Sequence, residues 1–502
     1  MSQKKIGVLL SYVQISVTIL VNLLYTPVML RLLGQSEYGV YSLSNSVIGY
    51  FVLLYAGMTS TYMRYYSRYE KQGDRQDVAK LNGLFLVLFS VLGCLALAIG
   101  VLASQHLELF LGNGLTAEEY GLARILFIIM AFNMALLMPK TVFSTIVIAH
   151  ERFVFIKFLD IVYAGLIPLV SLPLLYLGYG SVGMSCAVLS ITAITLLANM
   201  CYCTWKLDVP FQFSQLPFSL LPGMFSFSAF IFLQGIMDQL NWQLGKVLLS
   251  NFADSAAIAV YSVGLQIDLL FISFSGAFSG VVVPQIYQLV QDGATDKLTQ
   301  LWIKVGRYQF FVVYFIWIGF LFFGKAFIML WAGEEYEDAY IVALLLMTPI
   351  LLHLCQVLAM EILRAYNKHK MWTVVHFVFS IFGFLACIPL AKFFGVVGVA
   401  AGACVSMFIV ANLYDNWYYA KAADLNVREF FCEMRKLLPA ALLIIVVAAV
   451  LAQTIALTNW AKLMVVGAGF SASYGAILYG FAMNETERQL LIGGVRKFTE
   501  KL

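Results

Sequence analysis

The sequence predicts an all-helical membrane protein that crosses the bilayer about 14 times and has no sizeable domain outside it. Of its 502 residues, 62% are hydrophobic and only 12% are charged, and the mean hydropathy is +0.87. Soluble proteins are roughly half apolar and about a quarter charged. Fourteen spans of about 20 residues use roughly 280 residues, so the other ~220 suffice only for loops and tails. A soluble globular protein is therefore excluded.

Apolar stretches long enough to cross a membrane are separated by charged residues, glycine or proline. In chain order they are 7–33, 40–63, 81–104, 121–149, 159–178, 181–205, 224–250, 257–289, 308–331, 340–366, 372–393, 396–420, 437–457 and 461–483. The first is longer than the roughly 7 to 15 residues of a signal-peptide core and lacks a small-residue cleavage pattern. We therefore expect it to remain as the first membrane helix.

The basic residues predict the orientation of these helices. Most of the 31 lysines and arginines fall in the tails or in loops after even-numbered helices, whereas outer loops carry acidic residues such as 334-EEYED-338. Short loops rich in Lys and Arg stay in the cytoplasm. We expect a multi-pass protein of the cytoplasmic membrane with both termini cytoplasmic. The basic residues in or at the outer ends of helices are Arg31, Arg124, Lys140, Lys246, Lys325, Lys392 and Lys462.

Short segments recur in the same order at a nearly constant offset, which indicates an internal repeat. The pairs are Val40–Ser42 with Val260–Ser262, Gly180–Gly183 with Gly395–Gly398, and Ala149–Arg152 with Ala365–Lys368. They predict two parallel six-helix lobes around a central cavity, related by an axis along the membrane normal. The predicted parts are an N-terminal lobe (1–205), a cytoplasmic linker (206–223), a C-terminal lobe (224–420), and two extra helices with a cytoplasmic tail (421–502).

Metal and catalytic motifs are absent from the sequence. The eight cysteines lie mostly in apolar stretches, and Cys201 and Cys203 lack the spacing of a zinc site. His353 and His376 have no metal-ligating companions nearby in the sequence, so we expect structural roles for both. There is no phosphate-binding loop that would allow ATP hydrolysis, and no nucleophile–base–acid set. We predict no metal, no enzymatic activity and no nucleic-acid partner.

The turn 32-LLGQSEYGVYSL-43, which follows 22-NLLYTPVMLR-31, and the A-x-x-[RK] exits of the fourth and tenth helices resemble a known family. They are similar to the polysaccharide-transporter (oligosaccharide flippase) branch of the multidrug/oligosaccharidyl-lipid/polysaccharide (MOP) exporter superfamily, over nearly the whole chain. The resemblance implies a cavity that opens alternately to each side. It further implies flipping of an undecaprenyl-diphosphate-linked oligosaccharide to the outer leaflet, for cell-surface polysaccharide biosynthesis.

The same resemblance implies membrane lipids as partners and makes a polysaccharide polymerase and glycosyltransferases candidate partners. Lipid II flippases carry arginines within the first helix, whereas here Arg31 lies at its outer end. Drug exporters of the superfamily usually carry a carboxylate inside the first helix, and none is present here. Both departures favour an oligosaccharide cargo, with a cation-coupled drug exporter as an alternative.

Two alternatives come from other classes of protein. A membrane-embedded polysaccharide polymerase or ligase is expected to hold its acceptor in a long outer loop bearing Arg and His. The longest outer segment, 105–120, has one His and no Arg. A non-transporting scaffold of a polysaccharide assembly complex would not need polar residues in its seventh helix.

That seventh helix, 224–250, carries an unusual polar stripe. Gln234, Asp238 and Asn241 lie at i, i+4 and i+7 on one face, and other polar residues follow a second face. A charge at the bilayer centre costs roughly 2.5 to 3.5 kcal/mol, so such residues face protein, a partner charge or water. We predict that the first stripe lines the cavity and binds sugar hydroxyl groups. The alternative is hydrogen bonding between helices.

Cationic side chains are candidates for binding the cargo's diphosphate. Lys140 lies deep inside the fourth helix. Arg31, Arg124 and Lys246 lie near outer helix ends, where extension of the side chain to the membrane surface is the alternative. Arg64 ends the second helix on the inner side beside several tyrosines, where an interfacial anchor is the alternative.

Two carboxylates, Asp238 and Asp268, come near the middle of the membrane in this arrangement. Either is a candidate for binding H⁺ or Na⁺ and coupling transport to an ion gradient. The alternative is a salt bridge to Lys140 or Lys246. We predict no cofactor other than such an ion.

Overall fold

The computed structural model describes residues 3–55, 57–112 and 114–489. These residues form helices and no strand, which confirms the predicted all-helical class. Nine helices of the described chain are long and apolar enough to cross a membrane, or eleven if two bent helix pairs each form one span. A polytopic membrane protein is therefore confirmed, and the count of fourteen spans stays a prediction.

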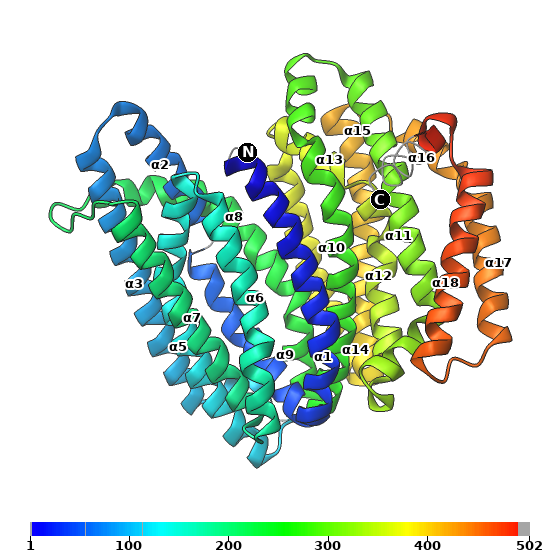
Figure 1. Ribbon diagram of the computed structural model, residues 1–502, viewed down its shortest axis with the longest axis horizontal. Coiled ribbons are helices and arrows are strands. Elements are labelled where there is room, and N and C mark those ends of the chain that lie inside the picture. Colours follow the sequence, from blue (N-terminus) through cyan, green and yellow to red (C-terminus); the bar gives the residue numbers. More distant parts are fainter. Residues whose placement is uncertain (1–2, 56, 113, 490–502) are drawn as a thin grey trace, which may run out of the picture. The chain divides into compact units, whose positions relative to one another are not determined.

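The first half of the chain forms the helices shown from blue to green in Figure 1. They are α1 (Gln3–Gly49), η1 (Tyr50–Tyr55), α2 (Met58–Gln72), α3 (Arg75–Gln105), α4 (Glu108–Leu111), α5 (Ala117–Ala149), α6 (Phe153–Tyr176), α7 (Gly180–Cys201), the π-helix η2 (Tyr202–Lys206), η3 (Phe218–Leu220), α8 (Leu221–Trp242) and α9 (Leu244–Phe252).

The second half continues from green to red in Figure 1. It contains α10 (Ser255–Gln291), α11 (Thr295–Trp331), η4 (Glu334–Tyr336), α12 (Ala339–Cys355), α13 (Val357–Ala365), α14 (His369–Phe408), the π-helix η5 (Ile409–Tyr414), α15 (Asp415–Ala423), α16 (Val427–Arg435), α17 (Leu438–Thr454), α18 (Trp460–Ile477) and the π-helix η6 (Leu478–Ala482).

Two compact units divide the chain. The first unit runs up to Ser262 and includes Phe384–Val399, and the second contains Val263–Gly383 and the chain from Ala400 onward. The predicted division into lobes at residues 206–223 stays a prediction. Within the second unit, α17 and α18 pack on each other and on α11, so the last two predicted membrane helices are attached to this unit.

Glycines break the two longest helical runs. The candidate spans Leu9–Gln72 and His369–Ala423 contain 64 and 55 residues. At about 1.5 Å per residue, each would be more than twice as long as the roughly 30 Å hydrocarbon layer is thick. Gly34 in α1 has φ 74° and Gly395 in α14 has φ 55°, values that glycine adopts without steric cost. Each break divides one long run into two helical segments.

Three predicted helices are not continuous, which corrects those predictions. The stretch 224–250 is divided at Gln243 into α8 and α9, and 340–366 is divided at Gln356 into α12 and α13, which are bent by 53°. The stretch 40–63 includes the end of α1, the 3₁₀-helix η1 and the start of α2. Hydropathy identifies the membrane-embedded length and does not register a local break whose polar groups are satisfied by neighbouring helices.

Small residues allow close packing within the first unit, where α3, α5 and α7 pack in sequence (Figure 1). A β-carbon added at Gly93 would lie 2.8 Å from the carbonyl oxygen of Ala135, and one added at Gly100 would lie 2.5 Å from the β-carbon of Ala131. Association of helices in lipid depends on such close approach. The glycines of α3 therefore set its distance from α5.

The predicted linker is fixed to α3 by polar contacts. The Asn82 side chain donates to the carbonyl oxygen of Pro210 at 3.0 Å and accepts from the Tyr62 hydroxyl at 2.7 Å. The amide of Gln212 donates to the carbonyl oxygen of Ala79 at 3.0 Å. The segment after η2 is thus held against α3, and α3 is in turn bonded to α2 through Tyr62.

Two glutamates connect the 32–43 turn to other helices of the first unit. Glu37 accepts hydrogen bonds from the Ser181 amide at 2.5 Å and the Ser181 hydroxyl at 2.7 Å. Glu119, at the start of α5, accepts from the Ser36 hydroxyl at 2.5 Å and from the Ser255 hydroxyl. The residues on which the family resemblance rests therefore form a junction between α1, α5, α7 and α10.

The hydroxyl groups of Ser42 and Ser262, which the internal repeat aligns with each other, are hydrogen-bonded at 2.7 Å. Nearby, a β-carbon at Gly39 would overlap the backbone carbonyl of Ser255. The second part of α1 and the start of α10 thus approach with almost no side chain between them, which only small residues allow.

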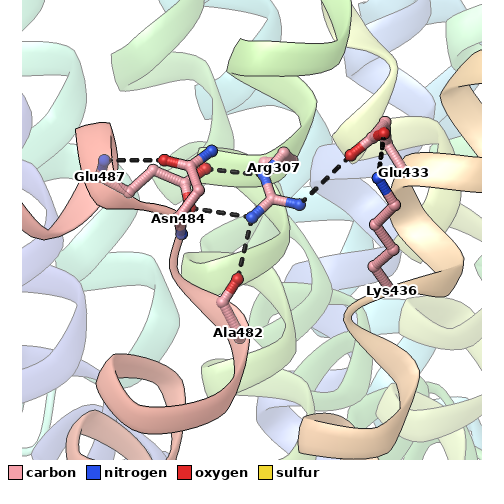
Figure 2. Close-up of polar contacts among 6 residues, drawn as sticks. All are labelled: Arg307, Glu433, Lys436, Ala482, Asn484 and Glu487. Atoms are coloured by element: carbon pink, nitrogen blue, oxygen red, sulfur yellow. Dashed lines mark hydrogen bonds and ion pairs between the residues drawn. The ribbon is translucent and has the colours of Figure 1, made fainter.

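A buried ion pair ties the segment that follows η6 to α11 in the second unit (Figure 2). Arg307 donates from Nε to Oε1 of Glu487 at 2.7 Å and from Nη2 to Oε2 at 2.8 Å, and both side chains are less than 10% exposed. Arg307 also donates to the carbonyl oxygen of Ala482 at 2.9 Å and lies 3.9 Å from Glu433 of α16. A bidentate pair of this kind fixes both position and angle.

We predict that Arg307→Met lowers the thermal unfolding temperature of the detergent-solubilised protein. Removing one partner of a buried ion pair leaves the other charge uncompensated and costs about 3 to 5 kcal/mol. Because the double variant Arg307→Met/Glu487→Leu removes both charges, it recovers part of that loss. Thermal unfolding followed by intrinsic fluorescence measures both effects.

The matched control is Lys325→Met, a variant of another basic residue of α11, which removes the exposed ion pair of Lys325 with Glu337. Exposed pairs contribute little. An unfolding temperature that falls as much in this control as in Arg307→Met contradicts the assignment of Arg307–Glu487 as the stabilising contact.

Candidate functional site

The two polar stripes of the predicted seventh helix have different surroundings. The second stripe is bonded to α1: the Gln239 amide lies 3.5 Å from the carbonyl oxygen of Gly49, and Gln243 accepts from the Ser46 hydroxyl at 2.9 Å. Lys246 is buried and donates to Gln243 at 3.4 Å. Interhelical hydrogen bonding therefore accounts for Gln239 and Gln243, whereas Lys246 bonds within its own segment.

The first stripe has no such partners. Asp238 is exposed, Gln234 and Asn241 are half-buried, and no side-chain hydrogen bond joins any of the three to another described residue. No ion pair within the described part of the chain links Asp238 to Lys140 or Lys246, in contrast to the salt-bridge alternative. A carboxylate and two amides that lack protein partners require water or a polar ligand.

Lys140 lies in a pocket between α2 and α5, here called the Lys140 pocket, with a volume of about 380 Å³. Its lining residues are Thr59, Ser60, Met63, Leu137, Lys140, Thr141, Ser144, Thr145 and Ile148. The ammonium group lies 4.3 Å from the centroid of the Tyr163 ring on α6, a cation–π contact.

The hydroxyl groups of the Lys140 pocket supply acceptors beside the cation. Thr141 and Thr145 each donate to a backbone carbonyl one turn earlier in α5, at 2.8 and 2.7 Å. Their oxygen lone pairs stay available as acceptors, whereas Ser60 and Ser144 add hydroxyl groups that serve as donors or acceptors. In such an arrangement the cation can bind a phosphate group, and the hydroxyl groups can bind a sugar attached to that phosphate.

The far end of α2 carries a second, basic pocket of about 430 Å³. It is lined by Arg64, Ser67, Arg68, Lys71 and Gln72, so three cations at i, i+4 and i+7 share one face of the helix. Sequence analysis selected only Arg64. The same helical spacing is the signal that could have added Arg68 and Lys71.

The other predicted site residues lie elsewhere. Arg31 is exposed, three residues before the break at Gly34, and Arg124 donates to the carbonyl oxygen of Ser104 on α3 at 3.1 Å. Neither lines the two pockets. Asp268, in the part of α10 that belongs to the second unit, is fully buried, and both its carboxylate oxygens lack a hydrogen-bond partner among the described residues.

A cluster of ionisable side chains in the second unit was missed by the sequence analysis. His376 Nε2 lies 2.8 Å from Oδ1 of Asp415, and His353 Nδ1 lies 3.3 Å from Oδ2 of the same carboxylate. The two histidines are isolated in the sequence. The packing of α12 against η5, together with the contact of His376 in α14 with Asp415 in α15, brings them together.

Comparison with known proteins agrees with this architecture. Residues 28–341, more than half of the chain, match the model of a family described as "Polysaccharide biosynthesis protein". A relative from Shigella flexneri named "Putative O-antigen transporter" is 20% identical over 399 residues, which cover 78% of this chain and 91% of the relative.

Two solved structures share the fold. The lipid II flippase MurJ in an inward closed conformation is 13% identical with a TM-score of 0.73, over 94% of this chain and 98% of that one. An inward-facing multidrug resistance MATE family transporter of the MOP superfamily is 15% identical with a TM-score of 0.68, over 82% and 96% of the two chains. The resemblance predicted from the sequence is confirmed.

We predict that single cysteines at Gln234 and Asn241 react with a membrane-impermeant maleimide, in a background from which the eight native cysteines have been removed. The reactive species is the thiolate, which forms in water and not in hydrocarbon. Phe232→Cys is the control on the same helix, since Phe232 is exposed but apolar. Labelling at Phe232 that equals labelling at Gln234 contradicts a water-facing polar stripe.

Proposed function

Because the chain belongs to the polysaccharide biosynthesis protein family, we propose that it is a flippase for an undecaprenyl-diphosphate-linked oligosaccharide. It moves this cargo from the cytoplasmic to the outer leaflet of the cytoplasmic membrane for cell-surface polysaccharide biosynthesis. The named relatives support this proposal, since one is called an O-antigen transporter and the other a lipid II flippase. Both are named as transport proteins, which favours transport over the polymerase or ligase alternative.

The Lys140 pocket is the observation that carries the proposal. A lysine inside an apolar span is costly unless it serves a ligand or a water-filled cavity. Here the ammonium group stands beside hydroxyl groups in an open pocket, with no carboxylate in ion-pair contact among the described residues. In the proposed mechanism Lys140 binds the diphosphate, and the hydroxyl groups of α2 and α5 bind the first sugar.

Arg64 lies on α2, which also supplies lining residues of the Lys140 pocket. It is near the end of α2 that we expect to face the cytoplasm, because that end is rich in basic residues. We propose that it receives the diphosphate from the cytoplasmic leaflet. Three further cations are proposed to bind the diphosphate near the outer side of the membrane: Arg31, Arg124 and Lys246.

Gln234, Asp238 and Asn241 are proposed to bind the oligosaccharide. Amide groups offer both donors and acceptors to sugar hydroxyl groups, and the carboxylate adds a strong acceptor. These side chains have no competing protein partners among the described residues.

Alternating access of two lobes then releases the cargo on the outer side, with both termini remaining in the cytoplasm. We propose Asp238 and Asp268 as carboxylates that bind a coupling H⁺ or Na⁺. Membrane lipids surround the protein. A polysaccharide polymerase and glycosyltransferases are its proposed partners at the start and end of the transport step.

We predict that Lys140→Ala slows translocation of a fluorescent undecaprenyl-diphosphate oligosaccharide across reconstituted vesicles by roughly 10- to 100-fold. The estimate follows from losing one charged hydrogen bond of about 1.5 to 3 kcal/mol. Lys140→Arg loses less of the rate than Lys140→Ala, because it keeps a positive charge that can pair with phosphate. Asp238→Asn also reduces the rate.

Lys462→Ala serves as the control, because this lysine is exposed at the start of α18 and donates to Thr458. A Lys140→Ala rate equal to wild type refutes the site assignment while leaving the flippase function. Wild-type protein that moves no cargo but supports polymer formation refutes the function itself.

A further inference from the structure

A carboxylate lies between two histidines in the interior of the second unit. Asp415 begins α15 and is fully buried, and the His376 side chain from α14 is 6% exposed. The His376 ring stacks on Trp372, with centroids 3.7 Å apart, which fixes its orientation. His353 reaches the same carboxylate from α12.

Only one of the two possible hydrogen bonds is formed. His376 Nε2 and Oδ1 of Asp415 are bonded at 2.8 Å. His353 Nδ1 and Oδ2 of Asp415 are 3.3 Å apart, yet neither atom has a hydrogen bond in the described part of the chain. A buried donor and acceptor left unpaired cost about 1 to 3 kcal/mol. A small rotation of the His353 ring closes this contact, and a proton on His353 turns it into a stronger, charge-assisted hydrogen bond.

The net charge of this His353–Asp415–His376 cluster also favours a bound proton. With both imidazoles neutral the cluster carries one net negative charge, and one added proton makes it neutral. Burying a net charge is far more costly than burying a neutral group. No lysine or arginine among the described residues forms an ion pair with Asp415. A proton is therefore the available counter-charge.

The other groups around the cluster do not supply that charge. Tyr414 of η5 and Tyr419 of α15 act electrostatically on Asp415, and both are neutral phenols at ordinary pH. α14 contributes Trp372, and Trp302 of α11 contacts Tyr419 edge to face. The described residues contain no three ligands arranged around one metal ion.

The cluster also lies at a joint between helices. The π-helix η5 ends directly before Asp415, and α12 ends at the 53° bend near Gln356. Asn412 donates to the carbonyl oxygen of Pro349 at 3.0 Å, and Gln356 donates to Asn416 at 2.7 Å. The pair His353–Asp415 thus lies between two formed contacts that join the same two segments. π-helices occur often at functional sites.

We propose that His353, His376 and Asp415 bind one proton between them and that this proton, in addition to the ion proposed for Asp238 and Asp268, couples transport to the proton gradient. The proposal deepens the flippase function and rests on it. Proton binding closes the His353–Asp415 contact and tightens the joint of α12 with η5, and proton release opens it.

The proton-binding part is tested by NMR of ¹⁵N-histidine in nanodiscs, because the chain has only five histidines. Between about pH 5 and pH 8 we expect the His353 and His376 signals to titrate as a coupled pair. Asp415→Asn uncouples them, whereas His106→Gln, at an exposed histidine, leaves them unchanged. Two imidazoles of wild-type protein that stay neutral over this range overturn the proposal, and this result needs no variant.

The coupling part is tested by cargo translocation in vesicles with a gradient of about 1 pH unit, which drives transport up to about tenfold. We expect Asp415→Asn and His376→Gln to lose this stimulation and His106→Gln to keep it. Wild-type translocation that ignores the gradient, or equal stimulation in Asp415→Asn, overturns the coupling alone. Wild-type protein that moves no cargo under any gradient overturns the flippase function, and with it the coupling.

Discussion

The absence of water inside a bilayer is the constraint on which this structure depends. Every polar group placed at that depth must find a protein partner, a ligand or a water-filled space. Gln243, for example, is satisfied by Ser46 and Lys246. These residues hold helices together. Gln234, Asp238 and Asn241 have no such partners among the described residues, so placing them in the membrane is costly unless water or a polar ligand contacts them.

Composition and apolar periodicity predicted the helical class and the approximate limits of most helices, because both follow from burial of whole segments in lipid. The breaks at Gln243 and Gln356 were not predictable in the same way. Gln356 bonds to Asn416, sixty residues away, and such a contact has no local signal. α11 begins at Thr295, well before the predicted 308, since its first turns are amphipathic and hydropathy does not count them. The 32–43 turn was recognised by its resemblance to a family, and the structure shows why two of its residues are glycines: Gly34 has a positive φ, and a β-carbon at Gly39 would overlap Ser255.

The candidate site residues differ in the same way: those placed by one segment were predictable, and those brought together from several segments were not. Helical spacing within one segment selected Gln234, Asp238 and Asn241, and it would also have selected Arg68 and Lys71 beside Arg64. Lys140 was predicted from its depth alone, whereas its pocket depends on Ser60 and Thr59 from another helix. His353 and His376 looked isolated because Asp415 joins them from a third helix. Sites assembled from distant segments are therefore the part that sequence patterns miss.

The most direct test of the central claim is a cryo-electron microscopy map of the protein in lipid nanodiscs, resolved well enough to place the first shell of acyl chains and ordered water around α8. We expect water density beside Gln234, Asp238 and Asn241, with lipid tails confined to apolar faces such as that of Phe232. Acyl chains packed directly along the three polar side chains would contradict the account.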